Sequence, residues 1–133
     1  MWHFGSKAEE RVYLALSSPT SQWHRYTIQG QISWSSIFKN CNETKRTVDL
    51  WIPQLLVAIE IHGRQHYEPV DFSGKSSDGG LSKYREQVRR DSQLRYWCEY
   101  SNCSLVELNH RKISTLTDEE LTSWIDKKIL EAI

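Results

Sequence analysis

The sequence predicts an α/β fold with a mixed central β-sheet flanked by helices. Two observations lead to this prediction. Segments rich in β-branched and aromatic residues alternate with amphipathic helical patterns, in the order helix, strands, helix, strand, helix. The chain has 133 residues, of which 38% are hydrophobic and 26% charged, and this suits one globular domain over residues 1–133 with one core.

The first and last helices are predicted from capping signals. Ser6 and Glu9 have the spacing of a capping box and open a helix over about 6–17. Residues 117–120 form a second capping box before the final helix. One face of that helix is apolar and can be either core or a dimer seam; it carries Leu121, Trp124, Ile125 and Ile129.

The strands are predicted from composition and turn residues. Residues 24–38 predict one or two strands, with a bulge or bend at Gly30. Residues 47–52 and 55–61 predict an antiparallel hairpin around a tight Pro-Gln turn.

The second half of the chain adds a long helix and one more strand. After a Gly- and Ser-rich loop over 71–80, Ser82 is expected to cap a helix that runs to about Tyr100. A broken apolar stripe on this helix comprises Leu81, Tyr84, Val88 and Leu94. Residues 104–108 then predict a short strand.

Charge and cysteine content narrow the function classes. Lys plus Arg and Asp plus Glu are both 17, so nucleic-acid binding requires a local basic patch. Cys41, Cys98 and Cys103 match no zinc spacing, which favours free thiols in a reducing cytoplasm. No apolar run is long enough to cross a membrane.

The predicted hairpin carries polar residues that a core strand does not need. Antiparallel pairing brings Asp49 and Glu60 near each other at one end of the sheet. Two carboxylates and a backbone carbonyl make a hard oxygen site that suits Mg²⁺ or Mn²⁺. His62 and His66 can act as general base or acid near neutral pH. Together these residue types fit metal-assisted phosphodiester hydrolysis.

Each of these residues also has an ordinary explanation. Asp49 can be an edge feature, Glu60 can pair with an arginine, and His66 can cap the strand end. Glu9 can serve only its capping box. The functional interpretation is favoured because four ordinary causes would have to coincide in one neighbourhood.

Residues 47–67, TVDLWIPQLLVAIEIHGRQHY, resemble the core of the PD-(D/E)XK nuclease superfamily, in which an Asp on one strand is followed by E-x-K on the next. His62 stands here in place of the lysine. The block is similar to the very-short-patch-repair endonuclease branch, where HG follows the strand and a second His comes later. Its phage and bacterial relatives carry an EYDG-x-QHY block, which matches Glu60 and residues 63–67 except that His62 replaces the Asp.

The resemblance extends to both sides of this block. An S-x-x-E start matches Ser6 and Glu9, and an RD pair on the later helix matches Arg90 and Asp91. It implies a restriction-endonuclease-like core for the predicted fold.

The resemblance also implies roles for individual residues. Asp49 would be the main metal ligand, the Ile61 carbonyl the second, and Glu60 would bind the metal directly or through water. His66 would be the base, and His62 would help to bind the scissile phosphate. Glu9 and Gln65 are expected to support this site from neighbouring positions.

The implied activity is that of a Mg²⁺-dependent DNA endonuclease, with Mn²⁺ as a substitute, in the cytoplasm of a bacterial or phage-infected cell. One alternative is a structure-selective nuclease such as a Holliday junction resolvase, which requires a homodimer. Others are a catalytically inactive module that binds DNA or protein, and a subunit whose partner supplies sequence recognition.

DNA contact is expected from a basic run on the long helix. The run covers 83–95 and contains Lys83, Arg85, Arg89, Arg90 and Arg95. Arg64 adds charge just after the strand. Such a run is ordinarily a solvated face, but beside a nuclease site it predicts a surface that follows the phosphate backbone.

Overall fold

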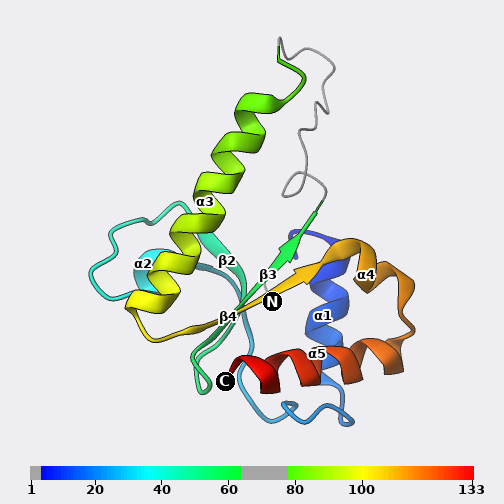
Figure 1. Ribbon diagram of the computed structural model, residues 1–133. Coiled ribbons are helices and arrows are strands. Elements are labelled where there is room, and N and C mark those ends of the chain that lie inside the picture. Colours follow the sequence, from blue (N-terminus) through cyan, green and yellow to red (C-terminus); the bar gives the residue numbers. More distant parts are fainter. Residues whose placement is uncertain (1–3, 64–77) are drawn as a thin grey trace.

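The computed structural model describes residues 4–63 and 78–133, and its centre is a four-stranded sheet (Figure 1). The strand order is β1-β2-β3-β4. The strands are β1 (Gln29–Ser33), β2 (Thr47–Ile52), β3 (Val57–His62) and β4 (Ser104–Asn109). β1, β2 and β3 pair antiparallel, whereas β4 is parallel to β3, so the sheet is mixed as predicted.

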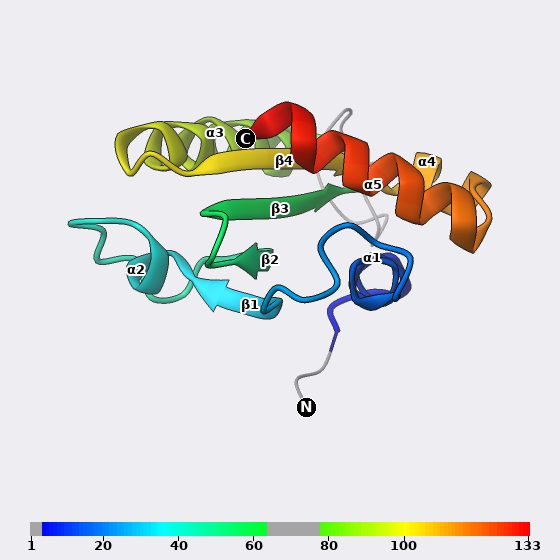
Figure 2. The same cartoon turned by 90° about the horizontal axis from the view of Figure 1, so that it is seen from below.

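Helices cover both faces of this sheet (Figures 1 and 2). They are α1 (Lys7–Ser17), α2 (Trp34–Ile37), α3 (Leu81–Tyr100), α4 (His110–Thr115) and α5 (Asp118–Ala132). On one face, α1 and α5 bury residues such as Leu16 and Ile125 against Ile59. On the other face, α2 and α3 bury Trp34 and Leu94 against strand residues. Burial of this apolar surface is the main force that holds the layers together.

The apolar face of α5 belongs to the core. Leu121, Ile125 and Ile129 are almost completely buried, and Trp124 packs partly buried beside them. The capping box predicted at its start is confirmed, because Thr117 N–H donates to Glu120 Oε1 at 2.9 Å and Glu120 N–H donates to Thr117 Oγ1 at 3.2 Å. Of the two alternatives for this face, the structure shows core.

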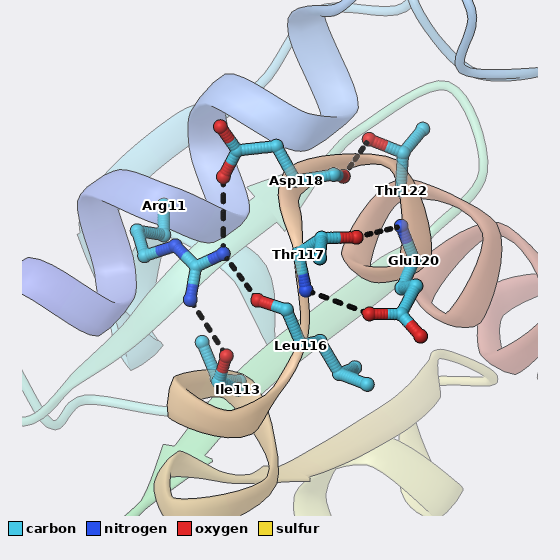
Figure 3. A network of polar contacts seen from close by, with 7 residues as sticks. All are labelled: Arg11, Ile113, Leu116, Thr117, Asp118, Glu120 and Thr122. Carbon is cyan, nitrogen blue, oxygen red and sulfur yellow. Dashed lines mark hydrogen bonds and ion pairs between the residues drawn. The ribbon is translucent and has the colours of Figure 1, made fainter.

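Arg11 connects α1 to the junction between α4 and α5 (Figure 3). Its guanidinium donates to the Ile113 carbonyl at 2.7 Å and to the Leu116 carbonyl at 2.9 Å. It also pairs with Asp118 at 3.0 Å, but that carboxylate is 97% exposed. The two carbonyl bonds are therefore expected to contribute most of the stabilisation, because exposed ion pairs contribute little.

Arg11→Met should lower the free energy of unfolding by about 2 kcal/mol, since it leaves two carbonyls at a helix junction without their charged donor. Asp118→Asn is the matched control and should cost less than about 1 kcal/mol. Urea unfolding of both variants measures the difference. Equal losses in the two variants would show that only the exposed ion pair matters.

The prediction for residues 24–38 was wrong outside five positions. The strand is confined to Gln29–Ser33, and the chain then enters the short helix α2. Ser33 Oγ lies 3.2 Å from Ser35 Oγ and 2.9 Å from Ser36 Oγ. Such local hydroxyl bonding competes with the regular pairing of a strand.

The hairpin turn is longer than predicted. β3 begins at Val57, not at Leu55, because residues 53–56 form the turn and Leu56 takes a positive φ of 54°. Leu55 N–H donates to the Ile52 carbonyl and Leu56 N–H to the Pro53 carbonyl, both at 3.2 Å. The antiparallel pairing itself is confirmed.

The start of the long helix also differs from the prediction. Gly80, with φ 88°, is the N-cap of α3, and Ser82 lies inside the helix. The Asp78 carboxylate supplies the capping acceptor, since it accepts from Ser82 N–H at 3.0 Å and from Gly80 N–H at 3.1 Å. Most of the predicted loop over 71–80 lies outside the described residues.

The buried stripe of α3 is shorter than the predicted apolar stripe. The helix buries Asp91, Leu94 and Cys98, whereas Val88 is 41% exposed. The first half of α3 extends beyond the sheet (Figure 1), so apolar residues there have little core to meet.

Helix α4 was not predicted. Asn109 begins it by accepting from Arg111 N–H at 2.8 Å.

Among the described residues, none of the helices is long and apolar enough to cross a membrane.

Candidate active site

The hairpin brings Asp49 close to Glu60. The antiparallel pairing of β2 and β3 reaches Leu50 and Ile59, and the next residue outward on each strand is an acid. The Asp49 carboxylate accepts from the N–H of Ile61, the neighbour of Glu60, and its charge acts on the pKa of Glu60. The two acids therefore lie close together, as the sequence predicted.

Asp49 is held by its neighbours in a defined orientation. One carboxylate oxygen, Oδ2, accepts from the Ile61 backbone N–H at 2.7 Å. The other, Oδ1, accepts from the Gln31 side-chain amide at 3.3 Å. These two bonds fix the direction of both Asp49 oxygens.

Glu60 is a buried acid with an unsatisfied oxygen. Its side chain is 7% exposed, and in the described part of the chain Oε1 has no hydrogen-bond partner. Burial, followed by the nearby charge of Asp49, raises the pKa of Glu60 well above its usual value. The charge of Arg90 opposes this shift. Unsatisfied buried carboxylate oxygens are costly, so this atom is a candidate position for a ligand.

Arg90 reaches this site from α3. The residue is half-buried and donates to the Thr47 carbonyl at 3.4 Å, beside the start of β2. Its charge acts on Glu60 from the facing helix. The sequence assigned Arg90 to a DNA-binding surface, and the structure places its charge near enough to act on Glu60.

Glu9 approaches from the N-terminus of α1. It is 5% exposed, and its carboxylate accepts from Gly5 N–H at 2.7 Å and from the Gln31 amide at 2.9 Å. Burial above all, with a further contribution from Asp49, raises the pKa of Glu9 to about 7, while the bonds from Gly5 and Gln31 act in the opposite direction.

A capping role alone therefore does not explain where the Glu9 carboxylate lies. Glu9 N–H does donate to Ser6 Oγ at 3.2 Å. Its carboxylate, however, accepts from Gly5 and not from the N-cap residue itself, and it extends to the site on the sheet. Glu9 from α1 and Glu60 from β3 are thus each close to Asp49 on β2.

Sequence reasoning missed Gln31, which bridges two of these acids. Its amide nitrogen lies within hydrogen-bond distance of Glu9 and Asp49, and its oxygen accepts from the Thr47 hydroxyl at 2.6 Å. Its position in the strand pairing could have identified it. Gly30 pairs with Leu50, and the next residue along β1, Gln31, therefore lies opposite Asp49.

Glu107 was also missed, and it lies beside Glu60 on the parallel strand β4. Arg95 binds its Oε1 through Nε at 3.0 Å and Nη2 at 2.9 Å. His62 is buried, and its Nε2 lies 3.7 Å from the same oxygen. The register of a parallel strand partner was the missing information, because β4 alone reads as an ordinary alternating strand.

The remaining predicted residues lie in several parts of the chain. Arg64, Gln65 and His66 lie outside the described residues. Lys83, Arg85 and Arg89 are exposed on α3, in keeping with an available charged surface, whereas the Arg95 guanidinium is paired with Glu107. Ile61 is half-buried, and its own backbone N–H donates to Asp49.

The acids do not by themselves form a finished metal site. Over residues 4–63 and 78–133, no three His, Cys, Asp or Glu side chains are placed so that they could hold a metal ion together. The carboxylates would have to move closer, or a donor from elsewhere would have to join them. Their oxygen chemistry and excess negative charge are nevertheless what a hard divalent cation requires.

Comparisons with known proteins give no relatives. No protein-family model matches the chain, and neither the curated proteins nor the solved structures contain a match.

Proposed function

We propose that this chain is a Mg²⁺-dependent DNA endonuclease with a restriction-endonuclease-like core, acting in the cytoplasm of a bacterial or phage-infected cell. The observation that carries the proposal is that two buried acids, Glu9 and Glu60, each lie close to Asp49. Burial and the charge of Asp49 raise the pKa of Glu9 and Glu60, and Glu60 Oε1 lacks a partner among the described residues. A cation at this point would compensate the repulsion and satisfy the oxygen.

The chain's own residues have separate roles in this proposal. Asp49, Glu60 and the Ile61 carbonyl would hold Mg²⁺, or Mn²⁺ in its place, and the Ile61 N–H keeps Asp49 oriented. When bound, the metal would supply a more acidic water and offset charge on the phosphate. His66 or the buried His62 would accept a proton, and Gln65 would support them.

The DNA would lie along the projecting half of α3. Lys83, Arg85 and Arg89 are exposed there. The sequence adds Arg64 to the predicted DNA contacts, and this residue lies outside the described residues. Arg90 and Arg95 act differently, since the structure directs them toward Glu60 and Glu107. Phosphate contacts of this kind position the duplex without reading its sequence.

Replacing both Arg85 and Arg89 by Ala should weaken DNA binding and flatten its salt dependence by a log–log slope of about 2, because each phosphate contact releases roughly one counterion. The cleavage rate at saturating DNA should stay near that of the parent. Fluorescence anisotropy over a series of salt concentrations measures the slope. Arg111→Ala, at an exposed position on α4, is the control and should change neither quantity.

Gly5→Ala should raise the Mg²⁺ concentration needed for half-maximal cleavage by about 10-fold, in the range typical for residues that support metal ligands. A Cβ at Gly5 would lie 2.7 Å from Glu9 Oε1, so the Glu9 carboxylate must move. Cleavage measured across a Mg²⁺ titration tests this. An unchanged Mg²⁺ dependence would mean that Glu9 does not need its present position.

The activity itself is tested by incubating the protein with plasmid, linear, mismatched and branched DNA, each with Mg²⁺, with Mn²⁺ and with a chelator. Nicking or cutting that needs a divalent cation supports the proposal. Preference for branched DNA, together with a dimeric mass in solution, would identify the resolvase alternative. The absence of cleavage on all four DNAs with either metal would refute the enzyme proposal.

A second candidate is a DNA-binding module without catalysis. The observation that favours it is the lack of a ready three-residue metal group within the described parts of the chain, together with His62 in place of a lysine. This candidate predicts DNA binding that a chelator does not affect, and no strand cleavage. A related candidate is a module that binds a partner subunit in place of DNA.

A further inference from the structure

We propose that Gln31 is a positioning residue of the site. Its side-chain amide holds the carboxylates of Glu9 and Asp49 side by side, and the backbone of β1 adopts an unfavourable conformation to place it there. This inference rests on the proposed function, because it concerns the same carboxylates.

Both the nitrogen and the oxygen of the Gln31 side-chain amide form hydrogen bonds. The nitrogen donates to Glu9 Oε1 at 2.9 Å and to Asp49 Oδ1 at 3.3 Å. One NH₂ group carries two hydrogens and can serve two acceptors at once. The amide oxygen accepts from the Thr47 hydroxyl at 2.6 Å, which keeps the nitrogen directed toward the acids.

The backbone of Gln31 is unusual for its position. Its φ is 50°, in the left-handed region that residues other than glycine seldom adopt. In the described residues, three other non-glycine positions have a positive φ, and all three are in turns: Asn40, Leu56 and Asn102. Turns commonly use this conformation, whereas Gln31 lies inside a strand.

The strand continues in register on both sides of Gln31. Gly30 pairs with Leu50, and Ile32 pairs with Val48. If only the path of the chain required a left-handed residue, glycine would satisfy it without strain. Glycine is present one position earlier, but the positive φ falls on Gln31, whose side chain makes the contacts with Glu9 and Asp49.

Strained residues persist where the surrounding structure determines them, and they concentrate at functional sites. Here the strain places an uncharged donor between two acids that otherwise repel each other. The amide donates to both carboxylates without occupying the position of a cation. Gln31 would therefore prepare Glu9 and Asp49 for metal binding.

Two substitutions separate this role from a purely structural one. Gln31→Asn keeps an amide and tolerates the left-handed backbone, but its side chain is one methylene too short. Gln31→Glu keeps the length and replaces the donor by a third negative charge. Gln29→Asn, at an exposed position on the same strand, is the matched control.

Gln31→Asn should raise the Mg²⁺ concentration for half-maximal cleavage by about 10- to 100-fold, as is typical when a residue that supports metal ligands is lost. Gln31→Glu should raise it less, because its added negative charge attracts the cation. The melting temperatures of both variants should stay within about 4 °C of the parent. The control should match the parent in both measurements. Losses of activity that follow melting temperature, with an unchanged Mg²⁺ dependence, would overturn the role.

The side-chain amide resonances of Gln31, observed by ¹H–¹⁵N NMR, test the contacts without any cleavage assay. They should shift clearly in Glu9→Gln, and remain unchanged in a distant variant such as Asp126→Asn. If the parent protein does not cleave DNA but these resonances respond to Glu9→Gln, the proposed function fails and the Gln31 contacts stand. If the chemical shifts of the Gln31 amide are the same in Glu9→Gln and in the parent, the inference is wrong even when the enzyme is active.

Discussion

Asp49→Asn should reduce DNA cleavage by at least about 10³-fold while the protein remains folded. The loss is large because the metal stabilises the transition state by several kcal/mol, and each 1.36 kcal/mol corresponds to about a factor of ten in rate. Asn is preferable to Ala here because its side-chain oxygen can still accept from Ile61 N–H, which Asp49 binds at 2.7 Å.

The same substitution should leave the metal-free protein at least as stable as the parent. Asp49 raises the pKa of both Glu9 and Glu60, so removing its charge relieves repulsion in the folded state. Calorimetric titration with Mg²⁺ should show weakened binding. This combination of lost activity with retained or increased stability is typical of functional sites and uncommon for core residues.

Asp126→Asn on α5 is a suitable control for this experiment. Asp126 also accepts two hydrogen bonds, from the Ser21 hydroxyl at 2.7 Å and from Gln22 N–H at 2.8 Å. It should lower stability slightly and leave cleavage unchanged. If Asp49→Asn cleaves DNA at a rate close to that of the parent, Asp49 is not a metal ligand and the assigned site is wrong.

The parts of the fold that the sequence predicted are those determined by local pattern. The terminal helices and the hairpin follow from capping residues and alternation, and the structure contains them. Within 24–38, where one or two strands were predicted, the structure has one strand, Gln29–Ser33, and serine hydroxyls bond locally where it ends. Helix α4 was missed because six residues offer too short a period to recognise.

The candidate site also contains residues that the sequence predicted and residues that it did not. Asp49 and Glu60 were found because acids inside apolar strands are conspicuous in sequence. Gln31 and Glu107 were not, because an ordinary Gln and Glu gain significance only when pairing places them opposite Asp49 and beside Glu60. Strand register between distant segments depends on tertiary packing, which local pattern does not encode.

The roles of the α3 arginines could not be separated from sequence either. Arg89 and Arg90 are adjacent in the chain, yet one is exposed and the other acts on Glu60. Adjacent helix positions point about 100° apart, so a basic run always distributes its charges over several directions. Only the position of α3 over the sheet decides which arginine turns inward.

Cleavage should rise with pH through about 7, and most of this rise should come from carboxylates. The pKa of Glu9 is raised to about 7, chiefly by burial, and that of Glu60 is raised well above its usual value. Metal ligands must be deprotonated to bind, so protons compete with Mg²⁺ below these values. At limiting Mg²⁺ the rate should fall by about 10-fold for each pH unit below 7 if one proton competes, or about 100-fold between pH 7 and pH 5.

Stability of the metal-free protein should change in the opposite direction. A carboxylate whose pKa is raised on folding binds its proton more tightly in the folded state, so its contribution to stability is present below the unfolded value of about 4.5. It is lost as pH rises through about 7. The difference in unfolding free energy between the parent and Glu9→Gln should therefore move against the parent from pH 5 to pH 8, and Mg²⁺ should stabilise the parent more at pH 8.

A histidine base would also make cleavage rise between pH 6 and 7, and the Mg²⁺ dependence distinguishes the two causes. If carboxylates bind the competing proton, higher Mg²⁺ displaces it, and the midpoint of the pH profile moves to lower pH as Mg²⁺ increases. If His66 or His62 limits the rate as a base, the midpoint stays fixed at saturating Mg²⁺. A midpoint that does not move, together with an unchanged profile in Glu9→Gln, would assign the titration to an imidazole and exclude a supporting role of Glu9 at the metal site.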